Sequence, residues 1–249
     1  MIVLDNVHKA FGAKKVLQGF SLEVKEGETM VIIGYSGTGK SVAIKHIVGL
    51  LMPDQGTIIV DGQEVPRLSR RELYELRAKI GYVFQFAALF DSMSIGDNVA
   101  MGLRKRGTMS EKEIADRVAE VLELVDLPNV QDKFPAELSG GMRKRVGLAR
   151  AIALRPKYIL YDEPTTGLDP VTSAVIDDLM IRMRDRLGVT SIVITHDMRS
   201  AYRVGTRIAM LYEGKVRQVG TVDEIRNSSD ETVRQFVEGR AEPDHAAGV

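Results

Sequence analysis

Residues 29–50 read TMVIIGYSGTGKSVAIKHIVGL, and this stretch decides the fold of the chain. The short apolar run at 29–33 predicts a buried strand, and the pattern from residue 40 to 50 predicts a helix. Between them, GYSGTGKS at 34–41 fits the spacing G-x-x-x-x-G-K-[ST], in which a glycine-rich loop joins a strand to a helix. Strand, loop and helix together predict a cradle for phosphate groups.

The residue types of this loop suit phosphate. Gly34, Gly37 and Gly39 let the backbone approach phosphate oxygens closely, so that several N–H groups point at them. Lys40 supplies a point charge to the β- and γ-phosphates, Ser41 offers a hydroxyl to Mg²⁺, and the helix dipole adds to the attraction. The predicted phosphate-binding residues are Gly34, Tyr35, Ser36, Gly37, Thr38, Gly39, Lys40, Ser41 and Val42.

Two carboxylates follow a second apolar strand, in YILYDEP at 158–164. Asp162 ends the strand, so its side chain is expected at the sheet edge, where it can hold Mg²⁺, often through water. Glu163 is placed to polarise an attacking water as a general base. Two such acids can also cap a helix or be solvated, but their occurrence after GKS in the chain favours catalysis.

Three single residues complete the predicted site. His196 follows the strand SIVIT (191–195), which places it at the carboxyl edge of the sheet near a γ-phosphate. Gln85 ends GYVFQ and is suited to sensing Mg²⁺ or the water, and Phe11 can stack on an adenine ring. Their alternatives are a structural histidine, a polar strand terminus and a core phenylalanine.

The sequence LSGGM at 138–142 predicts a second anion site. Ser139 and the N–H groups of Gly140 and Gly141, at a helix start, complement a γ-phosphate. The helix continues with a basic run: Arg143, Lys144, Arg145 and Arg150. These side chains either steer anionic nucleotide or solvate the helix, and we favour solvation.

Composition excludes several classes of function. The 249 residues suffice for one large domain or one domain with a subdomain. The formal net charge of zero provides no global basic field for non-specific nucleic-acid binding. No apolar run approaches the roughly 18 to 20 residues of a membrane span, and the N-terminus lacks the pattern of a signal peptide. The absence of cysteine excludes disulfides and fits the cytoplasm. We expect a soluble protein that needs a partner to hold it at a membrane.

The periodicity predicts an α/β fold. Early strands at 2–7, 20–24, 29–33 and 57–60 suggest hairpins, and later strands at 80–84, 158–162, 191–195 and 207–212 alternate with helical patterns. This alternation favours a mainly parallel sheet with helices on both faces. Residues 90–155 are predicted to be helical, with a capping box at Ser110 and Glu113. Residues 213–214 (EG) predict a hairpin turn, and the polar end at 241–249 predicts a mobile tail.

In their chain order, GKS, LSGGM, DEP and the histidine resemble the ABC transporter ATPase family, and the resemblance covers nearly the whole chain. It implies a P-loop NTPase (RecA-like) core with a mainly parallel sheet, an antiparallel β subdomain and a helical insert at about 90–155. The ATPase domain would cover 1–220, followed by a C-terminal extension at 221–249. The implied reaction is hydrolysis of ATP with Mg²⁺. Its catalytic residues would be Glu163, His196 and Lys40, and its metal-binding residues Ser41, Gln85 and Asp162.

The resemblance also implies partners. The LSGGM signature would face the phosphate cradle of a second copy in a head-to-tail dimer, and Asp169 in TTGLDP would connect the two sites. The dimer would work beneath a membrane permease, at the cytoplasmic face of the inner membrane. Residues 86–95 are the candidate contact with the permease, and 221–240 would serve docking, dimer stabilisation or local packing.

Met142 stands where glutamine is commonest in the signature. The GGM form, FQFAALFDSMSIGDNVA (84–100) and VTSAVIDDLM (171–180) resemble the ATPases of Mce/Mla-type lipid transporters. That resemblance implies lipid transport and a lipid-binding substrate protein in the complex. The alternatives are an importer of amino acids or other small solutes, a non-transport ABC ATPase, and a nucleotide-binding switch. Glu163 argues against the switch, and the single domain without a heptad run or basic surplus argues against the non-transport class.

Overall fold

The computed structural model describes residues 1–240, so the polar tail expected at 241–249 lies outside the described residues. By their contacts the residues form two compact units. Unit 1 comprises residues 1–69 and the chain from residue 192 onward, and unit 2 comprises residues 70–191. Within residues 1–240, no helix combines the length and apolar character needed to cross a membrane.

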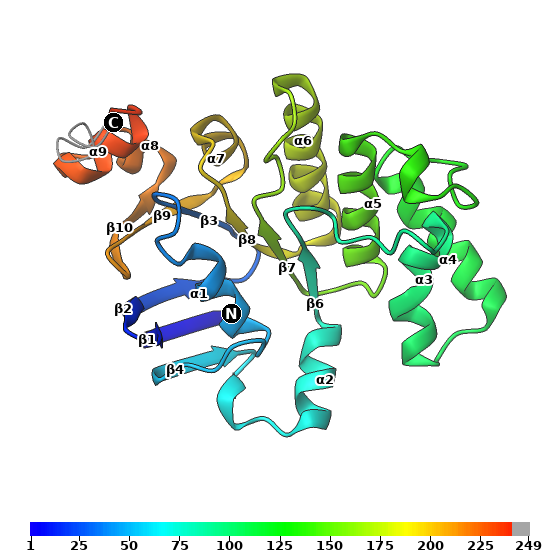
Figure 1. The fold of residues 1–249 in the computed structure, drawn as a ribbon, viewed down its shortest axis with the longest axis horizontal. Helices are drawn as coiled ribbons and strands as arrows, with labels where there is room; N and C mark the ends of the chain where they lie inside the picture. The colour runs from blue at the N-terminus through cyan, green and yellow to red at the C-terminus, as the bar shows by residue number, and fades with distance from the viewer. Residues whose placement is uncertain (241–249) are drawn as a thin grey trace. The chain divides into compact units, whose positions relative to one another are not determined.

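The first sheet of unit 1 is antiparallel, with the strand order β2-β1-β4-β5. Its strands are β1 (Ile2–Phe11), β2 (Lys14–Val24), β4 (Gln55–Val60) and β5 (Gln63–Glu64). Ile2 lies opposite Val24 on one side and Val60 on the other, and all three side chains are fully buried. Figure 1 shows α1 (Lys40–Ile47) beside this sheet. One face of the sheet therefore supports the helix that the phosphate loop opens.

The other strands of unit 1 build the scaffold of that loop. β3 (Thr29–Ile33) pairs in parallel with β9 (Arg207–Tyr212), which pairs in antiparallel with β10 (Lys215–Thr221). All five residues of β3 are buried, as expected of a parallel strand covered on both faces. The turn at Glu213 and Gly214 has positive φ at both positions (49° and 75°), which suits the tight hairpin predicted there. The remaining elements of unit 1 are the 3-10 turn η1 (Val65–Arg67) and helices α7 (Met198–Val204), α8 (Val222–Arg226) and α9 (Glu231–Val237).

Unit 2 combines two parallel strands with most of the helices. β6 (Ile80–Val83) pairs in parallel with β7 (Tyr158–Asp162). The helices are α2 (Arg70–Ala78), α3 (Ile95–Arg106), α4 (Glu111–Leu124), α5 (Gly140–Ile152) and α6 (Pro170–Leu187), with a 3-10 turn η2 at Pro135–Glu137. Figure 1 shows α3, α4 and α5 packed together, and the capping box predicted at Ser110 and Glu113 is present at the start of α4.

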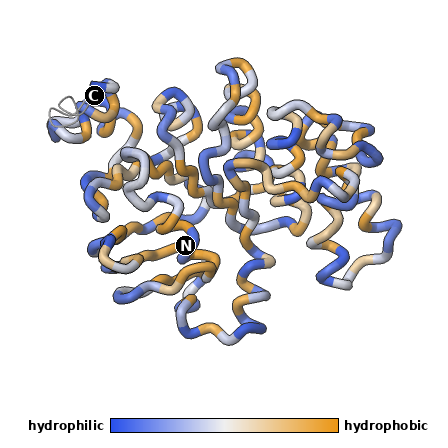
Figure 2. Tube along the Cα trace, in the orientation of Figure 1, coloured by the Kyte–Doolittle hydropathy of each residue, from blue (hydrophilic) through white to orange (hydrophobic). Residues whose placement is uncertain are grey.

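Strand β8 (Thr190–Ile194) crosses the boundary between the units. In unit 2, the N–H of Thr190 donates to the carbonyl of Lys157, which precedes β7 (3.1 Å). In unit 1, the N–H of Thr195 donates to the carbonyl of Ile32 in β3 (3.4 Å). Figure 2 shows hydrophobic stretches along the strands and hydrophilic stretches at the turns, in line with this buried position of the strands.

Strands β1, β2 and β10 depart most from the prediction. β1 runs on to Phe11 and β2 starts at Lys14, because register shifts between the two strands interrupt the alternation on which the prediction depended. β10 was not predicted, since it is an edge strand with several exposed residues and no clear apolar face. Its existence follows from pairing with β9 rather than from its own pattern.

Candidate functional site

The phosphate loop of unit 1 has glycines at positions where the backbone angles, and at Gly34 and Gly39 also the available space, disfavour other residues. Gly34, Gly37 and Gly39 have φ values of 147°, 76° and 103°. A Cβ atom at Gly34 would lie 2.3 Å from the carbonyl oxygen of Leu211, and one at Gly39 would lie 2.6 Å from Cγ1 of Val16. α1 begins at Lys40, directly after Gly39, so the unpaired N–H groups of its first turn face the loop. Such a loop is suited to bind an anion.

The ammonium group of Lys40 lies inside the loop. Only 7% of Lys40 is exposed, and its Nζ donates to the carbonyl oxygens of Gly34 (2.7 Å) and Tyr35 (2.9 Å). The Tyr35 carbonyl also accepts from the hydroxyl (2.9 Å) and the N–H (3.4 Å) of Thr38. Ser41 and Val42 are half-buried in the first turn of α1, and Ser36 is exposed. The loop therefore holds a positive charge at its centre.

A positively charged cavity of about 750 Å³ lies beside this loop within unit 1. Its wall includes Gly37 and Thr38. The charged residues of the wall are Lys14, Lys15, Glu213, Lys215, Arg217 and Asp230. Arg217 and Asp230 neutralise each other through an ion pair of 2.7 Å. Three lysines against one further carboxylate leave the cavity suited to an anionic ligand.

Phe11 and His196 are exposed side chains of unit 1. Phe11 ends β1 with 47% of its surface exposed, so it is not the core residue of the alternative interpretation. The ammonium of Lys9 lies 5.6 Å from its ring centroid. His196 follows the buried Thr195, whose hydroxyl accepts the N–H of Asp197 (3.0 Å), the residue that caps α7. A fixed strand end and a capped helix thus flank the histidine.

The two carboxylates of unit 2 have distinct environments. Asp162 ends β7, is 8% exposed, and accepts a hydrogen bond from Oη of Tyr82 (3.1 Å). Burial, together with this carboxylate, raises the pKa of the Tyr82 phenol, so Tyr82 stays a donor. Glu163 has a left-handed backbone (φ 52°), and its Oε2 accepts from the Thr166 hydroxyl (3.0 Å). A non-glycine residue in this conformation costs about 1–2 kcal/mol and is commonest where function requires it.

The second anion site predicted at LSGGM is also formed within unit 2. Ser139 caps α5 by accepting the N–H of Met142 (3.2 Å), and both Ser139 and Gly140 are exposed. A Cβ atom at Gly141 would lie 2.5 Å from Cγ2 of Thr172 in α6, so only glycine permits this approach of the two helices. The helix start therefore presents its N–H groups on the surface, as an anion site requires.

Asp169 caps the neighbouring helix α6. Its Oδ1 accepts the N–H groups of Val171 and Thr172 (both 3.0 Å), and its Oδ2 accepts the Thr172 hydroxyl. The Thr172 hydroxyl and N–H bonds hold the pKa of the Asp169 carboxyl below its usual range. Because Thr172 also contacts Gly141, the caps of α5 and α6 are linked through one threonine.

The predicted solvation of the basic run of α5 is wrong for Lys144, which is buried, and for Arg145 and Arg150, which are half-buried. Arg143 is exposed, as predicted. Lys144 donates to the carbonyl of Thr166 (2.6 Å), and Arg145 donates to that of Asp126 (3.0 Å). Arg150 donates to the carbonyls of Ala87 and Ala88 (both 2.7 Å). Arg143 donates to the carbonyl of Leu138 (2.7 Å). Burial lowers the pKa of Lys144 and of Arg150. These cations support loops of unit 2, because backbone carbonyls from distant segments lie around α5.

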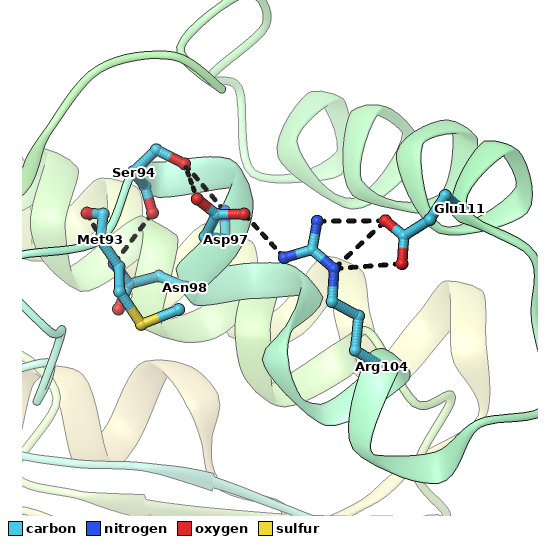
Figure 3. Close-up of polar contacts among 6 residues, drawn as sticks. All are labelled: Met93, Ser94, Asp97, Asn98, Arg104 and Glu111. Carbon is cyan, nitrogen blue, oxygen red and sulfur yellow. Dashed lines mark hydrogen bonds and ion pairs between the residues drawn. The ribbon is translucent and has the colours of Figure 1, made fainter.

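Gln85 begins a segment that α3 and α5 hold in place. Ala87 and Ala88, the two residues that Arg150 contacts, have positive φ values (60° and 48°). Asn98 of α3 is fully buried, and its Oδ1 accepts the N–H of Phe90 (2.8 Å). Its Nδ2 lies within hydrogen-bonding distance of the carbonyls of Ser94 (2.9 Å), Phe90 (3.1 Å) and Met93 (3.2 Å). Figure 3 shows the Asn98 side chain directed at Met93 and Ser94, the two residues at the end of the preceding turn. Asn98 was not predicted from the sequence to have a role, although its position among the apolar residues of α3 indicates a buried polar side chain.

An exposed chain of polar contacts continues from there along α3 (Figure 3). Ser94 caps the helix at Asp97, and the Asp97 carboxylate binds Arg104 (2.7 Å). Arg104 also binds Glu111 at the start of α4 (3.2 Å). Since these groups are exposed, each pair contributes little to stability.

Replacing Asn98 by alanine is expected to lower the free energy of unfolding by about 2–4 kcal/mol, because the N–H of Phe90 and the carbonyl of Met93 would lose the partner that the buried amide provides. Urea unfolding followed by circular dichroism measures this change. Arg104→Ala is the matched control on the same helix, with an expected loss below about 1 kcal/mol. Equal losses in the two variants would contradict the role of Asn98.

The residues present suit ATP and Mg²⁺. Mg²⁺ prefers oxygen ligands, which the Ser41 hydroxyl in unit 1 and the Asp162 carboxylate and Gln85 amide in unit 2 can provide. In the described part of the chain, no three histidine, aspartate or glutamate side chains gather into a cluster of metal ligands.

Comparisons with known proteins agree with these features. The family model described as ABC transporter matches residues 17–166. The probable ribonucleotide transport ATP-binding protein mkl of Mycobacterium leprae is 41% identical over 239 residues, covering 96% of this chain and 69% of the relative. The intermembrane phospholipid transport system ATP-binding protein MlaF of Haemophilus influenzae is 40% identical over 242 residues (97% and 92%). The methionine import ATP-binding protein MetN of Carboxydothermus hydrogenoformans is 44% identical over 228 residues (90% and 67%).

A solved structure shares the fold. It is a dimeric, post-hydrolysis state of an ATP-binding cassette bound to ADP and Pi, with a TM-score of 0.82 and 36% sequence identity. The match covers 89% of this chain and 99% of that chain. The α/β P-loop architecture predicted from the sequence is thereby confirmed.

Proposed function

The chain belongs to the ABC transporter family of ATP-hydrolysing subunits, and from this premise we propose that it powers the movement of lipid through a partner permease. Family membership carries the ATPase activity and the use of ATP with Mg²⁺. Subunits of this family work with membrane permeases and associate with them peripherally on the cytoplasmic side. The substrate, the individual residue roles and the lipid-binding partner protein are our proposals.

In the proposed mechanism, Phe11 stacks on the adenine and the phosphate loop binds the phosphates. Lys40 shifts from the carbonyls of Gly34 and Tyr35 toward the β- and γ-phosphates. Its ammonium thereby exchanges neutral carbonyl acceptors for charged phosphate oxygens, which form stronger hydrogen bonds. Ser41, Gln85 and Asp162 would provide oxygen ligands for Mg²⁺, and the ion would neutralise part of the charge of the phosphates. Glu163 accepts a proton from the attacking water, and His196 donates a hydrogen bond to the γ-phosphate.

We propose that a second copy of the chain completes each site. Ser139 and the N–H groups of Gly140 and Gly141 lie at an exposed helix start, available to a partner's γ-phosphate. A two-fold arrangement then makes two identical sites, with Asp169 at the interface. The solved relatives of this fold include dimeric cassettes, which supports such an assembly. Loss of the γ-phosphate would loosen the dimer and drive the transport motion.

The segment at 84–94 carries the assignment to lipid. Phe86 is 83% exposed and Phe90 is 52% exposed, although Arg150 and Asn98 fix the backbone that bears them. Exposed aromatic side chains on a fixed loop are typical of a contact surface for a partner. This segment also belongs to one of the stretches that resemble the Mce/Mla-type lipid transporters (84–100), so its partner is proposed to be a lipid permease.

Phe86→Ser tests this proposal. The tagged chain is purified in detergent from membranes of its source, and co-purifying membrane proteins and phospholipids are identified by mass spectrometry. We expect a permease and bound phospholipid with the unchanged chain and with the control Leu187→Ser, which alters another exposed apolar side chain (41%), at the end of α6. Phe86→Ser should weaken association with the permease by about 1–3 kcal/mol, which raises the Kd about five- to 150-fold and lowers recovery accordingly. A permease that co-purifies with a soluble amino-acid-binding protein instead of lipid would contradict the lipid assignment.

The second candidate function is import of an amino acid, favoured by the 44% identity to a methionine import protein. The same purification distinguishes the two, because a methionine-type complex would stimulate ATP hydrolysis with a loaded soluble binding protein. A lipid-type complex would respond to phospholipid in the surrounding bilayer.

A further inference from the structure

The C-terminal helices of unit 1 contact the phosphate loop itself. The ring of Tyr35, the second residue of the loop, meets the ring of Phe236 in α9 edge to face, with centroids 5.1 Å apart and planes at 84°. Tyr35 also meets Tyr212 at the end of β9, with centroids 6.3 Å apart and planes at 63°. Edge-to-face geometry is favourable for aromatic pairs, so the three rings form a cluster that fixes the Tyr35 side chain.

Tyr35 is the residue whose backbone organises the loop. Its carbonyl accepts hydrogen bonds from Lys40 and Thr38, and the residue before it, Gly34, packs against the backbone of Leu211. Tyr35 thus links α9, which contacts its side chain, to Lys40, which donates to its carbonyl.

α9 is itself held firmly on unit 1. Asp230 caps the helix at Thr232 (3.0 Å) and Val233 (3.2 Å) and is paired with Arg217 of β10 (2.7 Å). Val233 is fully buried. The helix is therefore a fixed support rather than a loose terminus.

The preceding helix, α8, contacts α7 within the same unit. The guanidinium of Arg226 lies 4.5 Å from the ring centroid of Tyr202 in α7. α7 is the helix that begins directly after His196 and Asp197. α8 and α9 thus contact both the helix that follows His196 and the loop that holds Lys40.

We propose that α8 and α9 form a positioning element for the nucleotide site, in which Phe236 keeps the phosphate loop in its binding shape through Tyr35. A preformed loop binds nucleotide without first losing conformational freedom, so the contact should lower the nucleotide Kd. Its effect should fall mainly on binding, because the ring that Phe236 contacts belongs to Tyr35, a predicted phosphate-binding residue. The inference rests on the proposed role of the Lys40 loop in binding phosphate.

The test compares nucleotide binding and turnover in the full chain. Phe236→Ala is expected to raise the Kd and KM for Mg-ATP about two- to tenfold, in line with the strength of one aromatic pair, with kcat changed by less than about twofold. Phe236→Tyr, which keeps the ring, should restore both values. In a Tyr35→Ala background, Phe236→Ala should cause no further rise. Ile58→Val is the control for a general loss of stability, since it removes one buried methyl group from β4 of the same unit without contacting the loop.

The outcomes separate this inference from the proposed function. If Lys40→Ala abolishes nucleotide binding while Phe236→Ala leaves the Kd unchanged, the positioning role is wrong and the phosphate loop stands. If Lys40→Ala binds Mg-ATP as tightly as the unchanged chain, the proposed role of the loop is wrong. Where Phe236→Ala unfolds, the Kd of Phe236→Leu, which removes the ring and keeps an apolar side chain, decides between the two results.

Discussion

Glu163→Gln is expected to lower ATP turnover about 10²- to 10⁴-fold while nucleotide binding is retained, the loss typical of a missing general base. Glutamine keeps the size of the side chain and an oxygen that can accept from the Thr166 hydroxyl. It cannot accept a proton from water, so only the chemical step is affected. The strained backbone of Glu163, with φ at 52°, supports the idea that this position is held for function.

Phosphate release under single-turnover conditions measures this loss, and equilibrium dialysis measures the Kd for Mg-ATP. Because hydrolysis no longer releases the γ-phosphate, the variant should also accumulate as an ATP-bound dimer in size-exclusion chromatography. Glu123→Gln, on the exposed side of α4, is the matched control and should behave as the unchanged chain. Normal turnover in Glu163→Gln would remove this residue as the base.

Chains with Lys40→Ala and chains with Ser139→Arg should each be nearly inactive, and a mixture of the two should regain activity. Lys40→Ala removes the cation of the phosphate loop, and Ser139→Arg places a bulky cation at the exposed start of α5. In a mixed dimer, one site combines the intact loop of one chain with the intact signature of the other. The second site carries both changes.

Random pairing at equal concentrations gives half mixed dimers with one intact site of two, so about a quarter of the normal activity should return if the sites act independently. Steady-state ATPase assays over a range of mixing ratios measure it. Mixing Lys40→Ala with a chain that carries both changes is the control and should restore nothing. Full activity of Ser139→Arg alone would show that the signature of one chain does not serve the nucleotide of another.

The sequence predicted β3, the phosphate loop and α1 correctly, because their structure depends on residues that are close together in the chain. β3 is a buried run of five residues, the loop glycines are required by backbone angles, and α1 starts at the lysine that the motif places first in its helix. The capping box of α4 was likewise readable, since its two residues are three positions apart. The ends of β1 and β2 were not, because register shifts broke the alternation.

The candidate site likewise has features that nearby residues predict and features that depend on distant segments. The sequence indicated which residue types suit phosphate, metal and water, and the structure places each of them at a strand end, a loop or a helix start within its unit. It did not reveal that Arg150 supports residues 87–88, which lie 63 positions earlier, or that Asn98 fixes the turn before α3. A run of charged residues on a helix is predicted to be solvated unless the segments packed against it are known.

By itself, the sequence determined the order of strands, loops and helices and the chemistry available at their ends, because hydrogen bonding, helix capping and backbone sterics act over a few residues. The tertiary structure alone decided which distant segments support those ends. Residues as far apart as Tyr35 and Phe236 meet only when the strands between them have paired, since packing free energy depends on contacts that no local pattern encodes.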